Sequence, residues 1–206
     1  DIAAKGAVAG LGGLAFSSGI PGSVGGGVVM NAGAYTGKMA DVVLRSQYLD
    51  AEGEVRILEA AEHDFYYRGS FFNDNKDHFV INTTFSLEPT PAKDIYDEMA
   101  DIALRRYKSQ PLNYPSGGSA FKRPPGHFAG KLISDAGLKG FWHGHAGVSG
   151  KHAGFIIQDG KSSASEVVEV FRIVQNKVYE MFDVMLYPEV KFIGDWQEEL
   201  PQRDSD

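Results

Sequence analysis

The amino-acid sequence predicts an α+β or α/β protein with a break between residues 88 and 115. Strand-like and helix-like periodicities follow one another along the 206 residues, and no internal repeat is present. Residues 110–127 hold four prolines and three glycines, which indicates a loop or a domain junction. The length allows one large domain or two small ones, each able to bury a core.

The first part of the sequence predicts one helix, one loop and three strands. Residues 2–16 favour a short helix of small residues, which their glycines weaken. Eleven of the 25 glycines fall within the first 37 residues, so residues 17–37 predict a glycine loop with a short buried piece at 28–30. The sequence begins at Asp1 inside this Ala/Gly-rich region without an initiating methionine, and we expect an N-terminal part to be missing.

Alternation of apolar and polar residues predicts the strands. Residues 41–49 and 54–58 form a hairpin around a turn at 50–53. Residues 78–87 form a further strand. One face of that strand carries Phe79, Ile81, Thr83 and Phe85.

The second part of the sequence mixes helices and strands. A helix starts at Thr90 and Pro91 and ends before Pro111, since proline suits the first turn of a helix but not its interior. Residues 128–138 are helical and 153–158 form a short strand. The remaining predictions are a long helix behind the capping box of Ser163 and Glu166, a strand at 190–193 and a polar tail at the end.

Composition excludes several classes of protein. The 27 acidic and 20 basic residues give a net charge of -7, which argues against a nucleic-acid binder because such proteins present a basic surface. The chain has no cysteine, which excludes disulfides, thiol nucleophiles and cysteine metal sites. No apolar stretch is long enough to span a membrane. We therefore expect neither nucleic acid nor membrane as a partner, and a cytoplasmic setting fits.

The glycine loop at residues 19–27 is the first candidate binding element. Glycines permit positive φ and close approach of the backbone, and successive N–H groups can converge on an anion such as a diphosphate. The loop lacks the Gly-Lys-Ser/Thr of a Walker A motif and the setting of a dinucleotide GxGxxG. A tight turn packed against another backbone is the alternative. Residues 31–35 extend the pattern.

Three further motifs carry groups suited to an anionic or acid–base site, each with a structural alternative. Arg68 follows two tyrosines and can hold a carboxylate, or can lie over aromatic rings at the surface. Ser119 precedes Lys122 and Arg123 and can donate a proton or bind phosphate, or can belong to a polar linker. Glu189 enters an apolar strand, where a raised pKa would suit acid–base work, or is a surface charge at a strand end.

The histidines are a weaker candidate. His143 and His145 form a His-x-His pair that could bind zinc, and His152 follows. No carboxylate or further ligand has the spacing of a metal site, so structural roles are favoured. We expect no metal.

Taken in order, five segments resemble the UDP-N-acetylenolpyruvoylglucosamine reductase family over about residues 6–195. They are SSGIPGSVGGGVVMNAGAYTG, YYRGSFF, SGGSAFKRPPGHFAGKLISDAGLKG, VSGKHAGFI and LYPEVKFIG. The interval from Arg68 to Ser119 is short, as in the class of this family that lacks a tyrosine-bearing loop there. The chain looks like the C-terminal two-thirds of such a protein.

The resemblance implies a particular α+β architecture. Part of a vanillyl-alcohol-oxidase-type FAD-binding domain is followed by an α+β substrate-binding domain. Residues 1–90 are then the C-terminal part of the FAD-binding domain, and residues 91–114 a connecting helix and linker. Residues 115–196 are the substrate-binding domain, and 197–206 a polar tail.

The resemblance also implies a flavoenzyme of peptidoglycan precursor synthesis. NADPH reduces FAD, and the reduced flavin reduces UDP-N-acetylglucosamine enolpyruvate to UDP-N-acetylmuramate. Arg68 matches the arginine of the Tyr-Arg motif, where it can neutralise charge on the substrate. Ser119 matches the serine that protonates the substrate, and Glu189 the glutamate near the C-terminus. The alternatives are a UDP-sugar-binding fragment without flavin, or another flavin oxidoreductase of the same fold.

Binding residues follow from the same resemblance. The residues implied for FAD are Gly19, Ile20, Pro21, Gly22, Ser23, Gly25, Gly26, Asn31, Ala32, Gly33, Ala34, Tyr35 and His152. The residues implied for the substrate are Tyr67, Lys122, Arg123 and Lys131.

Overall fold

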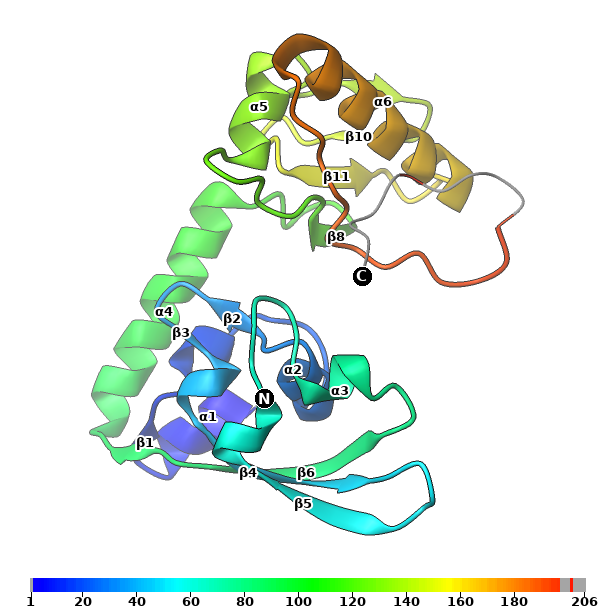
Figure 1. The fold of residues 1–206 in the computed structure, drawn as a ribbon. Coiled ribbons are helices and arrows are strands. Elements are labelled where there is room, and N and C mark those ends of the chain that lie inside the picture. The colour runs from blue at the N-terminus through cyan, green and yellow to red at the C-terminus, as the bar shows by residue number, and fades with distance from the viewer. Residues whose placement is uncertain (1, 197–200, 202–206) are drawn as a thin grey trace. The chain divides into compact units, whose positions relative to one another are not determined.

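The computed structural model describes residues 2–196 and residue 201. The chain forms two compact units, residues 1–105 and 106–206, with helix α4 (Ala92–Ser109) running across the boundary. Every strand pair among the described residues is antiparallel, and helices accompany the strands in both units (Figure 1). The fold is therefore α+β. The α/β alternative is wrong because it requires parallel strands.

A three-stranded sheet forms the frame of the first unit. Strand β4 (Val43–Leu49) pairs with β5 (Val55–Glu59) on one side and β6 (Phe79–Phe85) on the other. The hairpin predicted for β4 and β5 is confirmed. Asp50 closes its turn, because the carboxylate accepts the main-chain N–H of Glu54 at 2.7 Å.

The expected apolar face of β6 is not uniformly buried. Phe79 and Ile81 are 64% and 54% exposed, whereas Thr83 and Phe85 are half-buried. A register shift against β4 lies at this point and interrupts the alternation of faces.

The N-terminal helix is shorter than predicted. Helix α1 (Ile2–Val8) stops before Gly10, which takes a φ of 68° that a helix does not accommodate. The chain continues as β1 (Leu11–Gly12), which pairs with β7 (Glu88–Pro89), and then as the 3₁₀ turn η1 (Ala15–Ser17).

The glycine-rich segment contains regular structure that the sequence did not predict. Helix α2 (Val24–Val29) begins at Ser23, whose Oγ accepts the N–H of Gly26 at 3.0 Å. A hairpin of β2 (Gly33–Ala34) and β3 (Gly37–Lys38) follows. The remaining short elements of this unit are η2 (Met39–Asp41), η3 (Ala60–His63) and α3 (Phe71–Asp74).

The core of the first unit joins α1, the glycine-rich segment and the sheet. Its buried apolar members are Ala3, Leu14, Phe16, Val28, Met39, Val42, Val43, Leu58 and Phe72. Val28 is fully buried, which explains how a helix with three glycines is held in place: its tertiary contacts offset its low helix propensity.

The second unit is a four-stranded antiparallel sheet with two helices. The strand order is β8 (Ser116–Ser119), β11 (Phe155–Gln158), β10 (Ala146–Val148) and β9 (Trp142–His143). Helices α5 (Ala129–Asp135) and α6 (Ala164–Phe182) supply the apolar side chains of its core. The predicted capping box is confirmed, since Ser163 and Glu166 bond reciprocally at the start of α6.

The strand predicted at residues 190–193 is wrong. Among the described residues after α6, a single bridge joins Pro188 to Phe121, and residues 190–193 join no sheet. Val190 and Phe192 pack on the unit's core instead, which accounts for their apolar character without strand pairing. Among the described residues, no helix has both the length and the apolar surface of a membrane span.

Candidate functional site

The glycine loop at residues 19–27 contains glycines of two kinds. Gly19 and Gly22 hold φ values of 80° and 136°, and a Cβ added to Gly22 would meet no atom within 4 Å. A Cβ on Gly27, in contrast, would lie 2.9 Å from the Met39 side chain. Gly27 therefore serves close packing, whereas the space beside Gly22 would let a ligand approach its backbone.

Arg68 lies in a tight turn on the same unit. Tyr66 and Gly69 close this turn with main-chain hydrogen bonds of 3.1 Å from Tyr66 N to Gly69 O and 3.3 Å in the reverse direction. Arg68 has a φ of 60°, a left-handed conformation that costs a non-glycine residue about 1–2 kcal/mol. Its guanidinium carbon stands 5.0 Å from the centre of the exposed Tyr67 ring. The turn thus presents a cation supported by an aromatic ring.

Two side chains join this turn to the end of α2. The Nδ2 of Asn31 donates to the Tyr66 carbonyl at 2.9 Å, while its Oδ1 accepts the N–H of Ala40 at 3.0 Å. The fully buried Ser70 donates its hydroxyl to the carbonyl of Val29 at 2.9 Å. Asn31, which the resemblance places among the FAD residues, therefore directs both polar atoms of its side chain to the protein's own backbone.

Ser70, which adjoins the Arg68 turn, was not singled out by the sequence analysis. A signal was present: Asn73 stands three residues later, and its Oδ1 accepts the N–H of Ser70 at 3.2 Å. That spacing is typical of the start of a helix. The bond from Ser70 to Val29, however, has no sequence signature.

The second unit brings Ser119 and Glu189 together. Ala120, the residue after Ser119, donates its N–H to Gly154 O at 2.8 Å and accepts the N–H of Glu189 at 2.9 Å. Ser119 is exposed at the end of β8 and Glu189 is half-buried on the adjoining segment. The main chain of Glu189 therefore lies against Ala120, the residue that follows Ser119.

The cationic side chains implied for the substrate on this unit are Lys122, Arg123 and Lys131. The guanidinium of Arg123 lies 4.0 Å from the centre of the Phe128 ring. Lys131 forms an ion pair of 2.7 Å with Asp135 across one turn of α5. A phosphate would therefore compete with Asp135 for Lys131. Lys122 is half-buried, and its main-chain N–H donates to Tyr187 O at 2.8 Å.

His152 is placed near the Ser119 strand, by way of Gly154. Its Nδ1 accepts the N–H of Gly154 at 3.1 Å, and Gly154 O in turn accepts the N–H of Ala120. The neutral ring therefore carries its proton on Nε2, and the side chain is exposed. His152 can thus offer a hydrogen-bond donor to a ligand.

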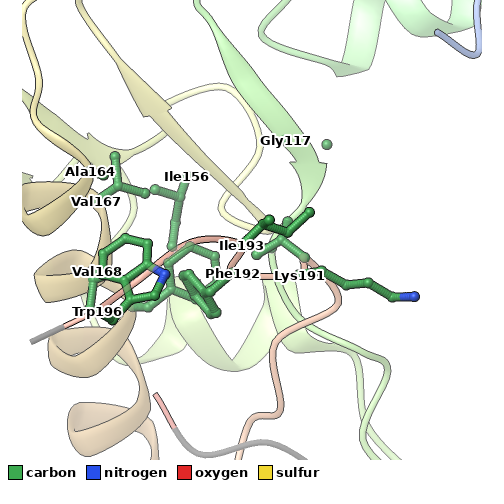
Figure 2. A pocket seen from close by; sticks show the side chains of 13 residues that line it. Gly117, Ile156, Ala164, Val167, Val168, Lys191, Phe192, Ile193 and Trp196 are labelled. Atoms are coloured by element: carbon green, nitrogen blue, oxygen red, sulfur yellow. The ribbon is translucent and has the colours of Figure 1, made fainter. Parts of the chain in front are cut away.

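An apolar cavity of about 430 Å³ lies behind β8 in the second unit (Figure 2). Apolar residues of β11, of α6 and of the segment at 190–196 line most of it. Lys191 is the one charged residue among those lining it, and Figure 2 shows its side chain extending away from the apolar groups. This cavity is therefore unsuited to a diphosphate, although Gly117 and Gly118 at its edge belong to the same strand as Ser119.

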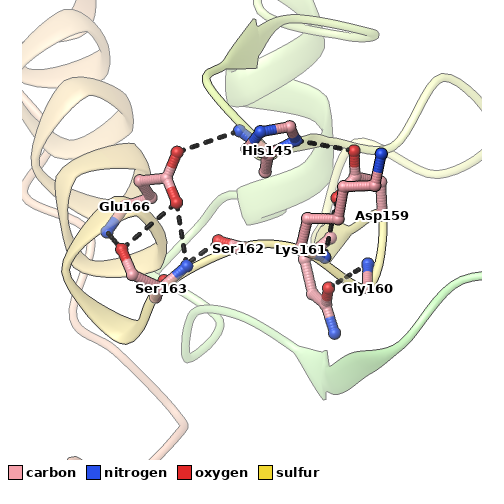
Figure 3. Close-up of polar contacts among 8 residues, drawn as sticks. His145, Asp159, Gly160, Lys161, Ser162, Ser163 and Glu166 are labelled. Carbon is pink, nitrogen blue, oxygen red and sulfur yellow. Dashed lines mark hydrogen bonds and ion pairs between the residues drawn. The ribbon is translucent and has the colours of Figure 1, made fainter.

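His145 of the His-x-His pair contacts two acidic residues. His145 Nδ1 lies 2.8 Å from the carboxylate of Asp159, and its main-chain N–H donates to Glu166 at 3.1 Å (Figure 3). The hydrogen bond with His145 is the main cause that lowers the pKa of Asp159. The pKa of Glu166 is lowered mainly by the main-chain N–H of Ser163, and next by that of His145. The described part of the chain holds no group of three or more residues placed to bind a metal.

Comparison with known proteins identifies the family. Residues 110–193, which include Ser119 and Glu189, match the family model for the UDP-N-acetylenolpyruvoylglucosamine reductase C-terminal domain. Reductases of this name from Agathobacter rectalis and Oceanobacillus iheyensis are each 49% identical to the chain, over 195 and 185 residues. The chain belongs to the UDP-N-acetylenolpyruvoylglucosamine reductase family. The resemblance drawn from the five motifs is confirmed.

The match extends to three dimensions. The crystal structure of UDP-N-acetylenolpyruvylglucosamine reductase from Thermus caldophilus aligns with a TM-score of 0.78 at 36% identity, covering 90% of this chain and 66% of that one. The alignments with the Agathobacter and Oceanobacillus reductases cover 95% and 90% of this chain, but 62% and 60% of those proteins. The chain thus spans about three-fifths of the length of the curated reductases it matches.

The residues implied for catalysis are divided between the units. Arg68 belongs to the first unit, together with the implied FAD residues at 19–35. Ser119 and Glu189 belong to the second, as do the three cations and His152. Each unit therefore carries a part of the site expected for this reductase family.

Proposed function

We propose that this chain supplies the substrate-binding groups and part of the flavin site of an NADPH-dependent reductase. The reaction converts UDP-N-acetylglucosamine enolpyruvate to UDP-N-acetylmuramate in peptidoglycan precursor synthesis. The observation that supports the proposal is the 2.9 Å hydrogen bond from Glu189 N to Ala120 O, which brings the main chain of Glu189 to the residue after the exposed Ser119. In a chain of this family, that pair suits a protonation step.

FAD is the cofactor in this proposal, with NADPH as the hydride donor. The glycine loop fits a diphosphate at Gly22, where positive φ and open surroundings let a ligand approach the main chain. Residues 19–26 would lie along the diphosphate, and the main chain of residues 31–35 along the ribityl. When bound, the reduced flavin supplies the hydride that the terminal enolpyruvyl carbon accepts.

The chain's own residues would manage the charge that this reduction creates. Hydride addition breaks the carbon–carbon double bond and leaves an electron pair on the carbon attached to the carboxylate. Arg68 would neutralise the negative charge as it spreads into that carboxylate, and so stabilise the transition state more than the ground state. Glu189 would hold the same carboxylate as a protonated acid or through a bridging hydrogen bond.

Ser119 would complete the reaction by giving its hydroxyl proton to the carbanionic carbon. A serine hydroxyl is a weak acid, so neighbouring cations must stabilise the oxygen that remains. Lys122 and Arg123 follow within four residues and are the groups proposed for this task. Lys122, Arg123 and Lys131 would face the phosphates of the UDP group. Tyr67, which precedes Arg68 in the first unit, would also contact the substrate.

The test is calorimetric titration of the chain with UDP-N-acetylglucosamine enolpyruvate. Saturable binding that Arg68→Ala weakens at least tenfold supports the proposal. Arg105→Ala is the matched control, because Arg105 is an exposed arginine of α4 paired with Asp101. Absence of binding, or equal binding by both variants, contradicts the proposed substrate site. A chain that binds the UDP-sugar, but keeps no flavin absorbance after mixing with FAD and desalting, favours the flavin-free alternative.

A further inference from the structure

The Arg68 turn is held to the end of α2 by two hydrogen bonds that run in opposite directions. Asn31 donates to the carbonyl of Tyr66 in the turn, and Ser70 donates back to the carbonyl of Val29. We propose that Asn31 and Ser70 are positioning residues that hold Arg68 in its left-handed conformation and thereby aim its guanidinium. The inference rests on the proposed function of Arg68 in binding the substrate carboxylate.

The turn has a sterically unfavourable backbone conformation, and it therefore depends on contacts with the surrounding protein. Arg68 adopts a φ of 60°, which side-chain-bearing residues rarely occupy. Gly69 has no room for a side chain, because a Cβ there would overlap the ring of Tyr66. A conformation of this kind persists only where the surrounding structure over-determines it.

Asn31 is well built for this task. Its side chain is 7% exposed and joins two segments, since it donates to Tyr66 at 2.9 Å and accepts from Ala40 at 3.0 Å. Its own φ of 42° is one that asparagine tolerates better than most residues. Loss of the amide hydrogen alone would leave the Ala40 contact in place and release the turn.

Ser70 supports the turn from its other end. It is fully buried, and its hydroxyl reaches Val29 at 2.9 Å, 41 residues away in the sequence. The short segment that carries Arg68 is therefore bonded on both sides. Before Arg68, the carbonyl of Tyr66 accepts from Asn31, and after it, Ser70 donates to Val29 at the end of α2. Relaxation of Arg68 to an ordinary φ would redirect its long side chain, and small misplacements of a charge-stabilising group are costly to binding and catalysis.

The first experiment measures the turn directly, by NMR hydrogen exchange at the amide of Gly69. Asn31→Asp keeps the shape and the acceptor of Asn31 but removes the donor, and Ser70→Ala removes the other bond. We expect exchange at Gly69 to quicken at least tenfold in both variants, while amides of β4 keep their rates. Asn82→Asp is the control, because Asn82 is an exposed asparagine whose amide bonds to Gln47. Unchanged exchange at Gly69 in both variants overturns the proposal.

The second experiment separates positioning from general stability. In calorimetry with UDP-N-acetylglucosamine enolpyruvate, Asn31→Asp should weaken binding about tenfold when Arg68 is present, and not at all when Arg68→Ala is already in place. An equal loss in both backgrounds overturns the positioning role. If the unaltered chain does not bind this ligand, the proposed function fails, and the exchange rates still decide whether Asn31 and Ser70 hold the turn.

Discussion

Glu189 donates its main-chain N–H to the carbonyl of Ala120 at 2.9 Å and so lies beside Ser119 at the end of β8. Lys122 donates to Tyr187 O at 2.8 Å in the same way, so the two segments run together for several residues. The pairing brings residues 187–189 to the strand that opens the sheet of the second unit. The segments that carry Ser119 and Glu189 thereby lie side by side in that unit.

Replacement of the proposed proton donor should separate the two half-reactions. In the FAD-loaded reductase, Ser119→Ala is expected to leave flavin reduction by NADPH unchanged. Substrate-driven reoxidation should slow by about 10²–10⁴-fold, the usual contribution of general acid catalysis. Stopped-flow absorbance of the flavin measures both steps.

The control for this experiment is Ser116→Ala, at the other end of the same short strand. It makes the same chemical change at an exposed serine and should leave both half-reactions near their original rates. Normal reoxidation by Ser119→Ala would remove Ser119 from the protonation step.

Replacement of Arg68 by glycine should separate stability from binding. Glycine adopts positive φ freely, whereas alanine at this position keeps the cost of about 1–2 kcal/mol. We expect Arg68→Gly to be at least as stable as the original chain and more stable than Arg68→Ala in urea unfolding. Both variants should lose affinity for the enolpyruvyl substrate. If Arg68→Gly were the less stable of the two, the strain assigned to the turn would be absent.

His63 should make the first unit sensitive to mild acid. Its Nδ1 faces the carbonyl of Glu59 at 2.9 Å and its Nε2 faces Ser46 Oγ at 2.9 Å, so the neutral ring satisfies both neighbours. Burial lowers the pKa of His63 from its usual 6.5. The unfolded chain therefore takes up the proton first as the pH falls. The stabilisation is complete above the unfolded pKa and is lost as the pH drops through the lower folded pKa.

Urea unfolding across this range of pH tests the point. The free energy of unfolding should fall as the pH is lowered below about 6.5, and His63→Gln should reduce that dependence whatever its effect at neutral pH. His127→Gln, at an exposed histidine, should keep the original dependence. An unchanged dependence in His63→Gln would show that other groups cause the acid sensitivity.

Gln175 should stabilise the segment that carries Glu189. Its side chain is 5% exposed, and its Nε2 donates to the carbonyl of the fully buried Leu186 at 2.6 Å. Gln175→Leu leaves that carbonyl without this donor, which should lower the free energy of unfolding by about 1–3 kcal/mol. Gln47→Leu, at a half-buried position on β4, should change it by less than about 0.5 kcal/mol. Equal effects of the two variants would contradict the role of this bond.

Elements whose signals are local were predicted correctly. Helix α4 lies between Pro91 and Pro111 because proline favours the start of a helix and cannot continue one. Helix α6 begins at the Ser163–Glu166 box, whose bonds lie within a single turn. The hairpin of β4 and β5 follows from alternation and a turn closed by Asp50.

The errors lie where distant contacts decided the conformation. The glycines of α2 favour a loop, yet Ser23 caps a helix there and burial of Val28 retains it. Residues 190–193 have the apolar pattern of a strand, but Val190 and Phe192 pack on the apolar core and the segment pairs with no strand. The burial of Val28 and the packing of Val190 and Phe192 depend on contacts with segments far away in the sequence.

The sequence by itself determined the mixture of helices and strands, the starts of the longer helices and the family to which the chain belongs, because these depend on residue types and on spacing along the chain. Only the tertiary structure decided that Glu189 lies beside Ser119 and that Asn31 and Ser70 hold the turn of Arg68. The hydrogen bonds at the turn join residues that are 35 and 41 positions apart in the sequence. The bond between Glu189 and Ala120 spans a longer interval still. Hydrogen bonds over such intervals form only after the chain has folded around its two cores, so no local pattern specifies them.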